Sequence, residues 1–428
     1  MKVAFYTLGC KVNQYETEAI SEQFKSKGYE ICDYDSYADI YVINTCTVTS
    51  MSDRKSRQII RRAKKINPHS FVIVTGCYAQ TSPDDIKKID GVNLIVGTED
   101  KNNILALYEQ YKNEEISLCT TDIMKTHTFT DMTVESCDRV RAYIKVQEGC
   151  NQFCSYCIIP YARGPIRSRN FDDVIKETKR LADNGFTEIT YVGIHIASYG
   201  LDTHSQGLGE LLCEANKIEN IKRIRLSSIE PMTLNEAFIE KIKDCDKLCH
   251  HFHLSLQSGC DETLARMNRK YTTAQYKSIC DGLKKHFPDV AITTDIMVGF
   301  AGETNAEFES TCEFVKDIAF ADAHIFQYSQ RKGTPADTYE NQVSADIKDK
   351  RSKIIQGICE TSKNDFMIKM LGQTHSVLFE QEISEGIYEG KTGNYQNVLV
   401  KSSNDISGKY IDVTLSGIKN GSFIGEIV

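Results

Sequence analysis

The segment YIKVQEGCNQFCSYCIIP, residues 143–160, places Cys150, Cys154 and Cys157 directly after an apolar stretch. Three thiolates so close together can hold three irons of a 4Fe–4S cluster, which leaves the fourth iron without a protein ligand. An open iron can chelate the amino and carboxylate groups of S-adenosylmethionine (SAM), and electron transfer can then split the sulfonium and release a carbon radical. Tyr156 places an aromatic ring beside the position that an adenine would take.

Other uses of three cysteines fit this spacing less well. A structural zinc site usually has paired CxxC elements and four ligands, and a self-contained ferredoxin cluster has a fourth cysteine close by. Inert buried thiols are a further alternative. They are disfavoured because all three cysteines lie within residues 150–157, before the loop-like stretch IIPYARGP. The segment resembles the radical SAM superfamily, whose motif is CxxxCxΦC with an aromatic residue at Φ.

The composition indicates a soluble globular protein. A chain of 428 residues suggests about three domains, and 41% hydrophobic with 26% charged residues is typical of that class. No stretch approaches the ~20 apolar residues of a membrane span, and the N-terminus has no signal-peptide pattern. We therefore expect a cytoplasmic protein without a membrane partner. In that compartment sixteen cysteines indicate metal binding or catalysis before disulfides.

Residues 1 to about 112 alternate between strand and helix patterns. Short apolar runs that alternate with helices predict a parallel sheet covered on both faces. The predicted strands are VAFYTLG (3–9), DIYVINT (39–45), FVIVTG (71–76) and NLIVG (93–97). The predicted helices cover residues 13–27, 52–66, 83–89 and a stretch from about 101.

Three of these strands end in a cysteine: Cys10, Cys46 and Cys77. Ligands of parallel α/β sheets bind just beyond the carboxyl ends of the strands, so these thiols are expected to converge. Gly9 and Gly76 would let the backbone approach a cluster closely. The pattern predicts a second three-cysteine site with one open iron; the alternative is three buried thiols at strand ends.

Residues from about 113 to 140 read as a polar linker, and six strand–helix units follow. Six such units favour a curled parallel sheet, a partial barrel, with Cys150, Cys154 and Cys157 at the carboxyl edge where barrel active sites lie. The predicted strands are 143–149, 187–195, 222–228, 251–258, 291–300 and 323–329. The predicted helices are 171–185, 208–218, 234–245, 273–287 and 305–319.

The pattern changes again over residues 372–428, where short strands are separated by Gly and Asn turns. This predicts a small antiparallel β-barrel of OB-like type. The segment contains four Lys against seven Asp and Glu, so its charge gives no support for RNA binding.

A basic segment lies within residues 54–65, although the net charge of −8 does not indicate a nucleic-acid-binding protein. Ile59, Ala63 and Ile66 have helical spacing and would face a core, which leaves the basic side chains exposed. A phosphate-binding surface and a solvated helix face both fit. The basic residues are Arg54, Lys55, Arg57, Arg61, Arg62, Lys64 and Lys65.

The order of these units resembles the methylthiotransferase family of radical SAM enzymes along essentially the whole chain. The opening TLGCKVNQYETE, residues 7–18, is similar to the branch that acts on N6-threonylcarbamoyladenosine in tRNA. Sister branches act on isopentenyladenosine in tRNA or on an aspartate of a ribosomal protein. The terminal barrel resembles the TRAM domain, which this family uses to hold RNA. The resemblance implies three domains at residues 1–125, 138–370 and 371–428.

The resemblance also implies the chemistry. The radical-generating 4Fe–4S cluster would be bound by the radical-site cysteines, Cys150, Cys154 and Cys157. An auxiliary 4Fe–4S cluster, which presents or donates sulfur, would be bound by the auxiliary cysteines, Cys10, Cys46 and Cys77. One SAM would yield the radical that attacks the C2–H of adenine, and a second would methylate the sulfur. The expected partners are the tRNA anticodon stem-loop and a low-potential electron donor.

A non-enzymatic iron–sulfur protein that binds RNA or carries electrons is an alternative of another class. The six-unit barrel argues against it, because pure electron carriers are small.

Several residues have a less specific signal. Gly193, Ser255 and Gln257 lie at strand ends where the family places SAM and substrate contacts. Ile296 and Val298 belong to a strand that could pack on adenine. Ordinary turn or core positions explain these residues equally well.

The family usually has Pro where this chain has Ala301, so that turn is expected to be looser. Six arginines are expected to meet RNA phosphate: Arg54, Arg57, Arg61, Arg163, Arg167 and Arg169.

The stretch CDKLCHHFH, residues 245–253, contains residue types that bind zinc. Its spacing straddles a helix end and a strand start, and strand alternation would send His251 and His253 to the same face. We therefore favour a structural role over a zinc site. The other cysteines are interpreted as core or surface residues: Cys32, Cys119, Cys137, Cys213, Cys260, Cys280, Cys312 and Cys359.

Overall fold

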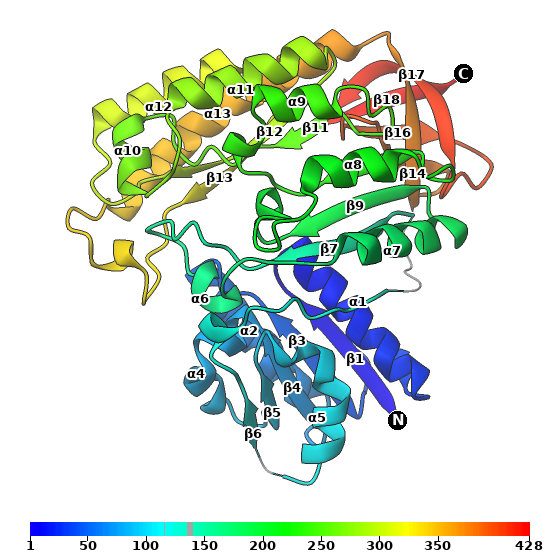
Figure 1. Ribbon diagram of the computed structural model, residues 1–428, viewed down its shortest axis with the longest axis vertical. Coiled ribbons are helices and arrows are strands. Elements are labelled where there is room, and N and C mark those ends of the chain that lie inside the picture. Colours follow the sequence, from blue (N-terminus) through cyan, green and yellow to red (C-terminus); the bar gives the residue numbers. More distant parts are fainter. Residues whose placement is uncertain (115, 135–139) are drawn as a thin grey trace.

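The computed structural model describes residues 1–114, 116–134 and 140–428. Its N-terminal part is a parallel sheet in the order β2-β1-β3-β4-β5-β6 (Figure 1). The four predicted strands are confirmed, and β2 and β6 are additional because three-residue strands show no alternation. The strands are β1 (Lys2–Thr7), β2 (Glu30–Cys32), β3 (Ile40–Thr45), β4 (Phe71–Gly76), β5 (Leu94–Val96) and β6 (Ser117–Cys119).

Strand β6 lies inside the segment that was expected to be a linker, so the described part of that segment is not all irregular. Its register pairs Leu94 of β5 with Ser117. Cys137, interpreted as an ordinary cysteine, lies outside the described residues, as does residue 138, the expected start of the second domain.

Helices cover both faces of this sheet, as the sequence predicts. Tyr15, Phe24 and Ile104 pack on one face, and Ile59 and Tyr78 pack on the other. The first face is covered by α1 (Lys11–Ser26) and α5 (Ile104–Tyr111). The second is covered by α2 (Ser50–Ile66), α3 (Cys77–Thr81) and α4 (Pro83–Lys87).

The middle of the chain forms the predicted partial barrel. Hydrogen-bonded neighbours follow the order β8-β7-β9-β10 and β11-β12-β13, and isolated parallel bridges such as Ile229 to Leu254 join the two groups. Only the two-residue β8, antiparallel to β7, departs from the parallel pattern of these strands. The strands are β7 (Ala142–Glu148), β8 (Arg167–Ser168), β9 (Glu188–Gly193), β10 (Arg223–Leu226), β11 (His251–His253), β12 (Ala291–Val298) and β13 (Asp322–Gln327).

Helices pack outside the barrel strands. The predicted ones are α7 (Phe171–Asp183), α8 (Leu208–Asn216), α9 (Glu236–Ile242), α11 (Thr273–His286) and α12 (Asn305–Ile318). Three further helices are α6 (Ile159–Arg163), α10 (Asp261–Arg266) and α13 (Ala345–Met370). Short 3₁₀ helices lie at η1 (Asp100–Asn103), η2 (Ile123–Lys125), η3 (Ile196–Ser198), η4 (Pro231–Thr233) and η5 (Pro335–Thr338).

The C-terminal strands close into a small barrel in the order β14-β15-β16-β18-β17. It is antiparallel except between β16 and β18, where Val398 pairs with Phe423 in parallel. A closed ring with an odd number of strands cannot alternate direction throughout, so one parallel pair is unavoidable. The strands are β14 (Thr374–Ser384), β15 (Ile387–Lys391), β16 (Asn397–Lys401), β17 (Tyr410–Lys419) and β18 (Ser422–Ile427).

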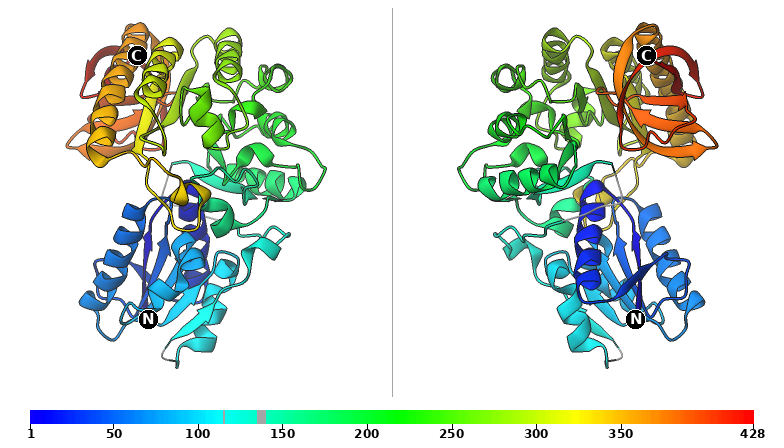
Figure 2. Two further views of the ribbon diagram at one scale, coloured as in Figure 1. Left: turned by 90° about the vertical axis from the view of Figure 1, so that its left-hand side faces the viewer. Right: turned by 90° about the vertical axis from the view of Figure 1, so that its right-hand side faces the viewer.

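The partial barrel packs against both other units. Figure 2 shows the N-terminal sheet at one end of the molecule, and the partial barrel and the C-terminal barrel side by side at the other. None of the helices among the described residues combines the length and apolar composition that crossing a membrane requires.

Candidate active site

The auxiliary cysteines lie together at the carboxyl edge of the N-terminal sheet. Strands β1, β3 and β4 are neighbours; Cys10 precedes α1, Cys46 follows β3 and Cys77 begins α3. Burial and then the nearby Cys77 thiol raise the pKa of Cys46 to about 11. The structure therefore brings these three thiols together, as the strand pattern predicts.

Cys10 is solvent-accessible and yet closely surrounded by protein. Its side chain is exposed, yet desolvation by the surrounding protein is the main cause of its raised pKa, opposed by Arg163 and reinforced by Cys77. Exposure of the side chain and desolvation of the thiol are both expected where protein surrounds a thiol without covering it. Three neighbouring thiols, one of them still accessible, fit a bound cluster.

Two glycines shape this edge of the sheet. Gly9 has φ +106°, and a Cβ there would lie 3.2 Å from the Cys46 sulfur. Gly76 has φ +99°, and a Cβ there would lie 2.3 Å from the carbonyl oxygen of Thr45. Any side chain would be strained at both positions and would collide with backbone at the second.

The radical-site cysteines occupy the loop that follows β7. Gly149 turns the chain with φ +74°, where a Cβ would collide with the Pro165 carbonyl at 1.8 Å. The Cys157 amide donates to the Cys154 carbonyl oxygen at 2.9 Å. Burial and then Cys154 raise the pKa of Cys157 to about 12. The pKa of Cys150 is raised to about 11, mainly by burial.

Arg269 contacts the radical-site cysteine Cys154. No spacing in the sequence indicates this contact. Its guanidinium donates to the Cys154 sulfur at 3.3 Å, to Glu230 at 2.8 Å and to the Ser255 carbonyl oxygen at 3.2 Å. Burial and then Arg269 lower the pKa of the nearby His195 to about 4. This imidazole is therefore neutral near pH 7.

Arg163 connects the segment after the radical-site cysteines to the auxiliary cysteine Cys77 and is completely buried. It lies at the end of α6, six positions after Cys157, and its Nε donates to the Cys77 sulfur at 3.3 Å. Its Nη1 lies 2.6 Å from Glu16 and 3.1 Å from Glu148. The expectation that Arg163 meets RNA phosphate is therefore wrong, because its charge is neutralised inside the protein.

Glu16 lies at the centre of a buried charge network. Burial alone would raise its pKa, but Arg163, Lys101 and Lys145 outweigh burial and hold it well below its usual value. Glu16 is therefore ionised and balances several cations behind the auxiliary cysteines.

Arg167 and Arg169 are also buried rather than available to phosphate. Arg167 lies 3.6 Å from Glu99 and donates to backbone carbonyls. Arg169 pairs with Glu177 and with Asp131, the latter at 2.7 Å. The prediction of RNA contacts for both is wrong, because acidic partners distant in sequence neutralise them.

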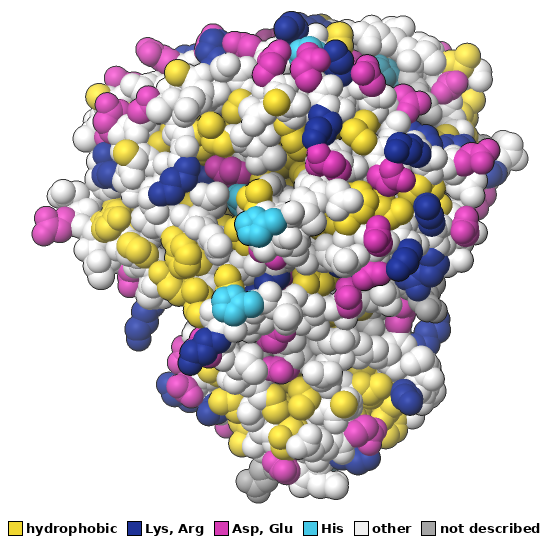
Figure 3. All heavy atoms as spheres, viewed as in Figure 1, with side chains coloured by type: hydrophobic (Ala, Val, Ile, Leu, Met, Phe, Trp, Pro, Cys, Tyr) yellow, Lys and Arg dark blue, Asp and Glu magenta, His cyan; other side chains and the backbone are white. Residues whose placement is uncertain are grey.

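The arginines of α2 are placed differently. Arg54 and Arg61 are exposed, and Arg57 donates to the Tyr78 hydroxyl at 3.0 Å. The basic side of α2 is thus open to solvent, whereas on the face drawn in Figure 3 basic and acidic side chains are intermixed.

The residues expected to contact SAM divide into two groups. Tyr156 packs edge-on against Phe300, Gly193 ends β9, and Gln257 has φ +67° with its amide bonded to the Asp295 carbonyl at 2.8 Å. With Ser255, they lie at the carboxyl edge of the barrel, near the radical-site cysteines.

Ile296 and Val298 belong instead to the core between β12 and the helices, with 0% and 1% exposure. The alternating residues Asp295 and Met297 take the inner face of the strand. Packing of the Ile296 and Val298 side chains on adenine is therefore inconsistent with this structure.

The histidine-rich segment does not form a compact metal site. His251 and His253 do share one face. His251 Nε2 and His253 Nδ1 each lie 3.0 Å from the Thr293 hydroxyl. Among the described residues, the only trio of potential ligands within 4.8 Å of one another is Glu236, Glu240 and His286 on outer helices.

Neither cysteine trio is as compact as that 4.8 Å group. A cube of four irons separates its thiolate ligands more widely than a single ion does, so the spacing fits a cluster better than one zinc ion.

Known families match two of the three units. Residues 2–97 match the model described as Uncharacterized protein family UPF0004, and residues 144–315 match the Radical SAM superfamily. The chain is similar in fold to the radical S-adenosylmethionine methyltransferase TsrM from Kitasatospora setae, with a TM-score of 0.59 and 14% identity over 78% of this chain and 77% of that chain.

Curated relatives match nearly the whole chain. The threonylcarbamoyladenosine tRNA methylthiotransferase MtaB of Bacillus subtilis is 43% identical over 96% of this chain and 93% of its own. The protein of the same name from Aquifex aeolicus is 38% identical over 93% of this chain and 98% of its own. The tRNA-2-methylthio-N(6)-dimethylallyladenosine synthase of Clostridium tetani is 35% identical over 99% of this chain and 95% of its own.

The matches to these relatives cover 93% to 99% of this chain, so they include both its N-terminal sheet and its partial barrel. Radical SAM enzymes use a 4Fe–4S cluster and SAM, so a non-enzymatic carrier is excluded. The chain belongs to the radical S-adenosylmethionine methylthiotransferase family.

Proposed function

We propose that this protein adds a 2-methylthio group to N6-threonylcarbamoyladenosine beside the anticodon of tRNA. The observation that carries the proposal is the presence of two three-cysteine sites, with the buried Arg163, six positions after Cys157, donating to Cys77 of the other site. Relatives named for this reaction, at 43% and 38% identity, support the choice of nucleoside.

We propose that Cys150, Cys154 and Cys157 hold one 4Fe–4S cluster and that Cys10, Cys46 and Cys77 hold a second. When bound, these groups together with two SAM molecules per turnover and a low-potential electron donor supply a carbon radical, a sulfur atom and a methyl group. Such reactivity suits the C2–H of adenine, which is inert to ordinary acids, bases and nucleophiles.

Two arginines of the chain tune the cysteine ligands. Arg269 donates to the Cys154 sulfur and Arg163 to the Cys77 sulfur, each at 3.3 Å. Hydrogen bonds to a ligating sulfur stabilise the thiolate and shift the potential of its cluster. These arginines would therefore act as positioning residues for the two sites.

Hydrogen bonds and an ion pair hold the N-terminal unit against the partial barrel, and a close fit between these units would shield the proposed radical site from water. Arg331, in the loop after β13, pairs with Asp53 at 2.8 Å and donates to Thr47 at 2.5 Å. Thr98 donates to the Ala162 carbonyl at 2.8 Å. A primary carbon radical requires such enclosure, since it would otherwise react with solvent.

The RNA partner is proposed to be the anticodon stem-loop of a cytoplasmic tRNA. Arg54 and Arg61 offer exposed charge to its phosphates, with Arg57 beside them. We assign these contacts to the first of three domains, 1–125, 138–370 and 371–428, and the TRAM-like last domain would add to them.

Nucleoside mass spectrometry of tRNA from a deletion strain tests the proposal. We expect 2-methylthio-N6-threonylcarbamoyladenosine to disappear, its unthiolated precursor to accumulate, and the wild-type gene to restore the product. Persistence of the methylthio nucleoside would refute the choice of substrate.

The same experiment covers a second candidate. The relative from Clostridium tetani, at 35% identity, is named for dimethylallyladenosine. Loss of 2-methylthio-isopentenyladenosine alone would therefore favour that substrate. If all tRNA nucleosides were unchanged, the ribosomal-protein aspartate would become the substrate to examine.

A further inference from the structure

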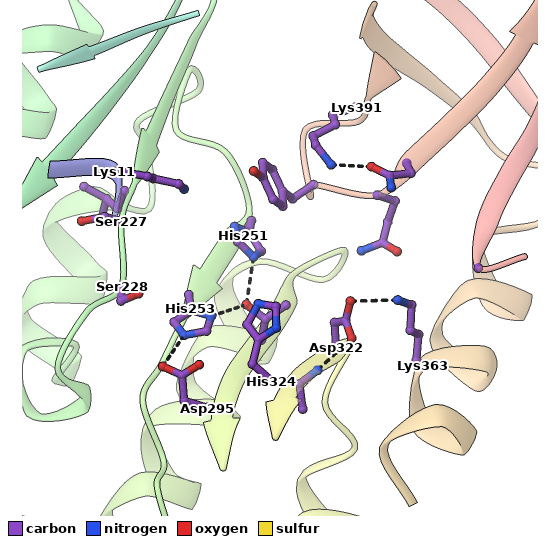
Figure 4. A pocket seen from close by; sticks show the side chains of 17 residues that line it. Lys11, Ser227, Ser228, His251, His253, Asp295, Asp322, His324, Lys363 and Lys391 are labelled. Carbon is purple, nitrogen blue, oxygen red and sulfur yellow. Dashed lines mark hydrogen bonds and ion pairs between the residues drawn. The ribbon is translucent and has the colours of Figure 1, made fainter. Parts of the chain in front are cut away.

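A polar cavity of about 390 Å³ lies where the three units of the molecule meet (Figure 4). Lys11, at the start of α1, borders it on one side. His251 and His253 line it from the inner face of β11, and Lys391 at the end of β15 and Tyr395 in the turn after it complete the lining. The C-terminal barrel therefore completes a cavity inside the partial barrel.

The turn that carries Tyr395 is held firmly in place. Arg225 donates to the carbonyl oxygens of Thr392 at 2.8 Å and of Gly393 at 2.9 Å. The Asn394 side chain donates to the Asp289 carbonyl oxygen at 3.1 Å. The cavity wall is thus fixed before any ligand arrives, which lowers the entropic cost of binding.

Most charged side chains that line the cavity have an opposite partner. Lys363 pairs with Asp322 at 2.8 Å, and Asp295 lies 3.1 Å from His253. Lys11 and Lys391 differ: neither forms an ion pair with a carboxylate in the described part of the chain, and Lys391 donates to the Asn397 side-chain oxygen. Two lysines are therefore available to an anion.

The aromatic ring of Tyr395 lies among the cationic side chains of the cavity. The Tyr395 ring centre lies 4.3 Å from the Lys391 nitrogen, 5.7 Å from the Lys11 nitrogen and 4.8 Å from the Arg225 guanidinium. The ring stacks on His251 at 4.8 Å with 17° between the planes. Burial and then Arg225 hold the pKa of His251 well below its usual value, so the histidine stays neutral.

The cavity adjoins the region between the proposed cluster sites. Lys11 directly follows Cys10. On the opposite wall, His253 lies two residues before Ser255, whose carbonyl oxygen accepts from Arg269, and Arg269 contacts Cys154. The walls of the cavity therefore come from segments that also carry or contact the proposed cluster ligands.

We infer that Lys11 and Lys391, with Tyr395 between them, bind the carboxylate of the N6-threonylcarbamoyl group of the substrate nucleoside. The inference rests on the proposed function and adds to it a site for substrate selection. A lysine–carboxylate hydrogen bond is charge-assisted and strong in an enclosed site, and a neutral N6 substituent cannot make it. These lysines would therefore distinguish threonylcarbamoyladenosine from isopentenyladenosine.

Binding of two synthetic anticodon stem-loops to the cluster-containing protein tests this. The RNAs are identical except that the threonyl carboxylate is free in one and a methyl ester in the other, and fluorescence anisotropy gives each Kd. Wild-type protein should bind the free carboxylate at least about tenfold more tightly. In Lys391→Gln this ratio should fall clearly below the wild-type value, because only Lys11 remains to bind the carboxylate, and the ester Kd should be unchanged.

Lys401→Gln is the matched control. Lys401 ends β16 of the same hairpin, its side chain is exposed, and it does not line the cavity. The substitution removes the same charge, so any loss of general attraction to RNA should affect both stem-loops equally. The wild-type ratio should remain. Preservation of that ratio in Lys391→Gln as well would overturn the inference.

A second experiment distinguishes the threonyl carboxylate of the RNA from the carboxylate of SAM. The Kd of SAM and the yield of 5′-deoxyadenosine without RNA are measured for Lys391→Gln. Both should equal the wild-type values, and a parallel loss would assign the cavity to SAM and overturn the inference. If wild-type protein forms no methylthio product from the carboxylate stem-loop, the proposed function fails. If it forms product without preferring the carboxylate, only this inference fails.

Discussion

Arg163 lies between the N-terminal sheet and the loop that carries the radical-site cysteines. Its guanidinium contacts Glu16, Glu148 and the Cys77 sulfur without any exposed surface. Removing one member of a buried ionic network leaves its partners charged and unsolvated, which is more costly than losing the pair as a whole. Arg163 is therefore a determinant of stability as well as of the auxiliary site.

Replacing Arg163 with Met should lower the free energy of unfolding by about 3–5 kcal/mol. Urea denaturation followed by circular dichroism would measure the change. Arg54→Met is the control, because the Arg54 side chain is exposed and its loss should cost less than about 0.5 kcal/mol. A stable Arg163→Met protein with weakened RNA binding would instead support the rejected phosphate role.

Replacing Cys154 with Ala should remove the proposed radical-generating cluster and leave the auxiliary one. We expect iron analysis to find one cluster and product analysis to find no 5′-deoxyadenosine, since the radical-site cysteines would no longer hold three irons. Cys77→Ala is the reciprocal control: it should still cleave SAM but transfer no sulfur. Formation of 5′-deoxyadenosine by Cys154→Ala would show that the two roles are assigned wrongly.

Helix α2 combines a buried apolar side with an exposed basic one. Ile59, Ile60 and Ala63 are buried, as the helical spacing indicates for Ile59 and Ala63. Exposure alone does not distinguish a phosphate-binding surface from a solvated helix face. The salt dependence of RNA affinity distinguishes them, because each phosphate contact contributes to it.

The double substitution Arg54→Gln/Arg61→Gln should weaken binding of the anticodon stem-loop and reduce its dependence on salt. Each lost phosphate contact lowers the slope of log K against log salt concentration by about 0.7–0.9. Titrations at several salt concentrations would measure it. Lys350→Gln/Lys353→Gln on α13 removes two exposed charges elsewhere and should leave the slope unchanged. An unchanged slope in the α2 variant would show that this face of the helix is exposed to solvent and does not bind phosphate.

Strand β12 shows how far an element can be predicted. Its position follows from the apolar run, but which side each residue takes depends on the register against neighbouring strands. Ile296 and Val298 face the helices, while Thr293 and Asp295 face the cavity. The apolar residues of β12 were predicted to contact the ligand, whereas the alternating polar residues line the cavity inside the partial barrel.

Two arginines of β10 join the partial barrel to the C-terminal barrel. Arg223 donates to the carbonyl oxygens of Lys391 and Ser376, and Arg225 to those of Thr392 and Gly393. These bonds couple the C-terminal barrel to the partial barrel, so the cavity depends on the whole assembly.

Replacing Arg225 with Met should loosen the turn that closes the cavity. Two charge-assisted hydrogen bonds are lost, so amides within residues 391–397 should exchange with deuterium at least about tenfold faster. Hydrogen-exchange mass spectrometry would measure this. Lys243→Met, on an exposed helix end, should change nothing in that peptide. Unchanged exchange in Arg225→Met would show that other contacts hold the turn.

The amino-acid sequence by itself determined the three-unit architecture and the grouping of six cysteines into two trios. Strand and helix periodicities are local properties, and cysteines at strand ends or in one short loop meet whenever those strands are neighbours. Only the tertiary structure decided the partners of the buried charges. Arg163, Arg167 and Arg169 look like phosphate ligands in isolation, and folding neutralises each with a distant acid. Folding likewise brings Lys11 and Lys391 from opposite ends of the chain to one cavity, because electrostatic environment depends on distance in space and not along the chain.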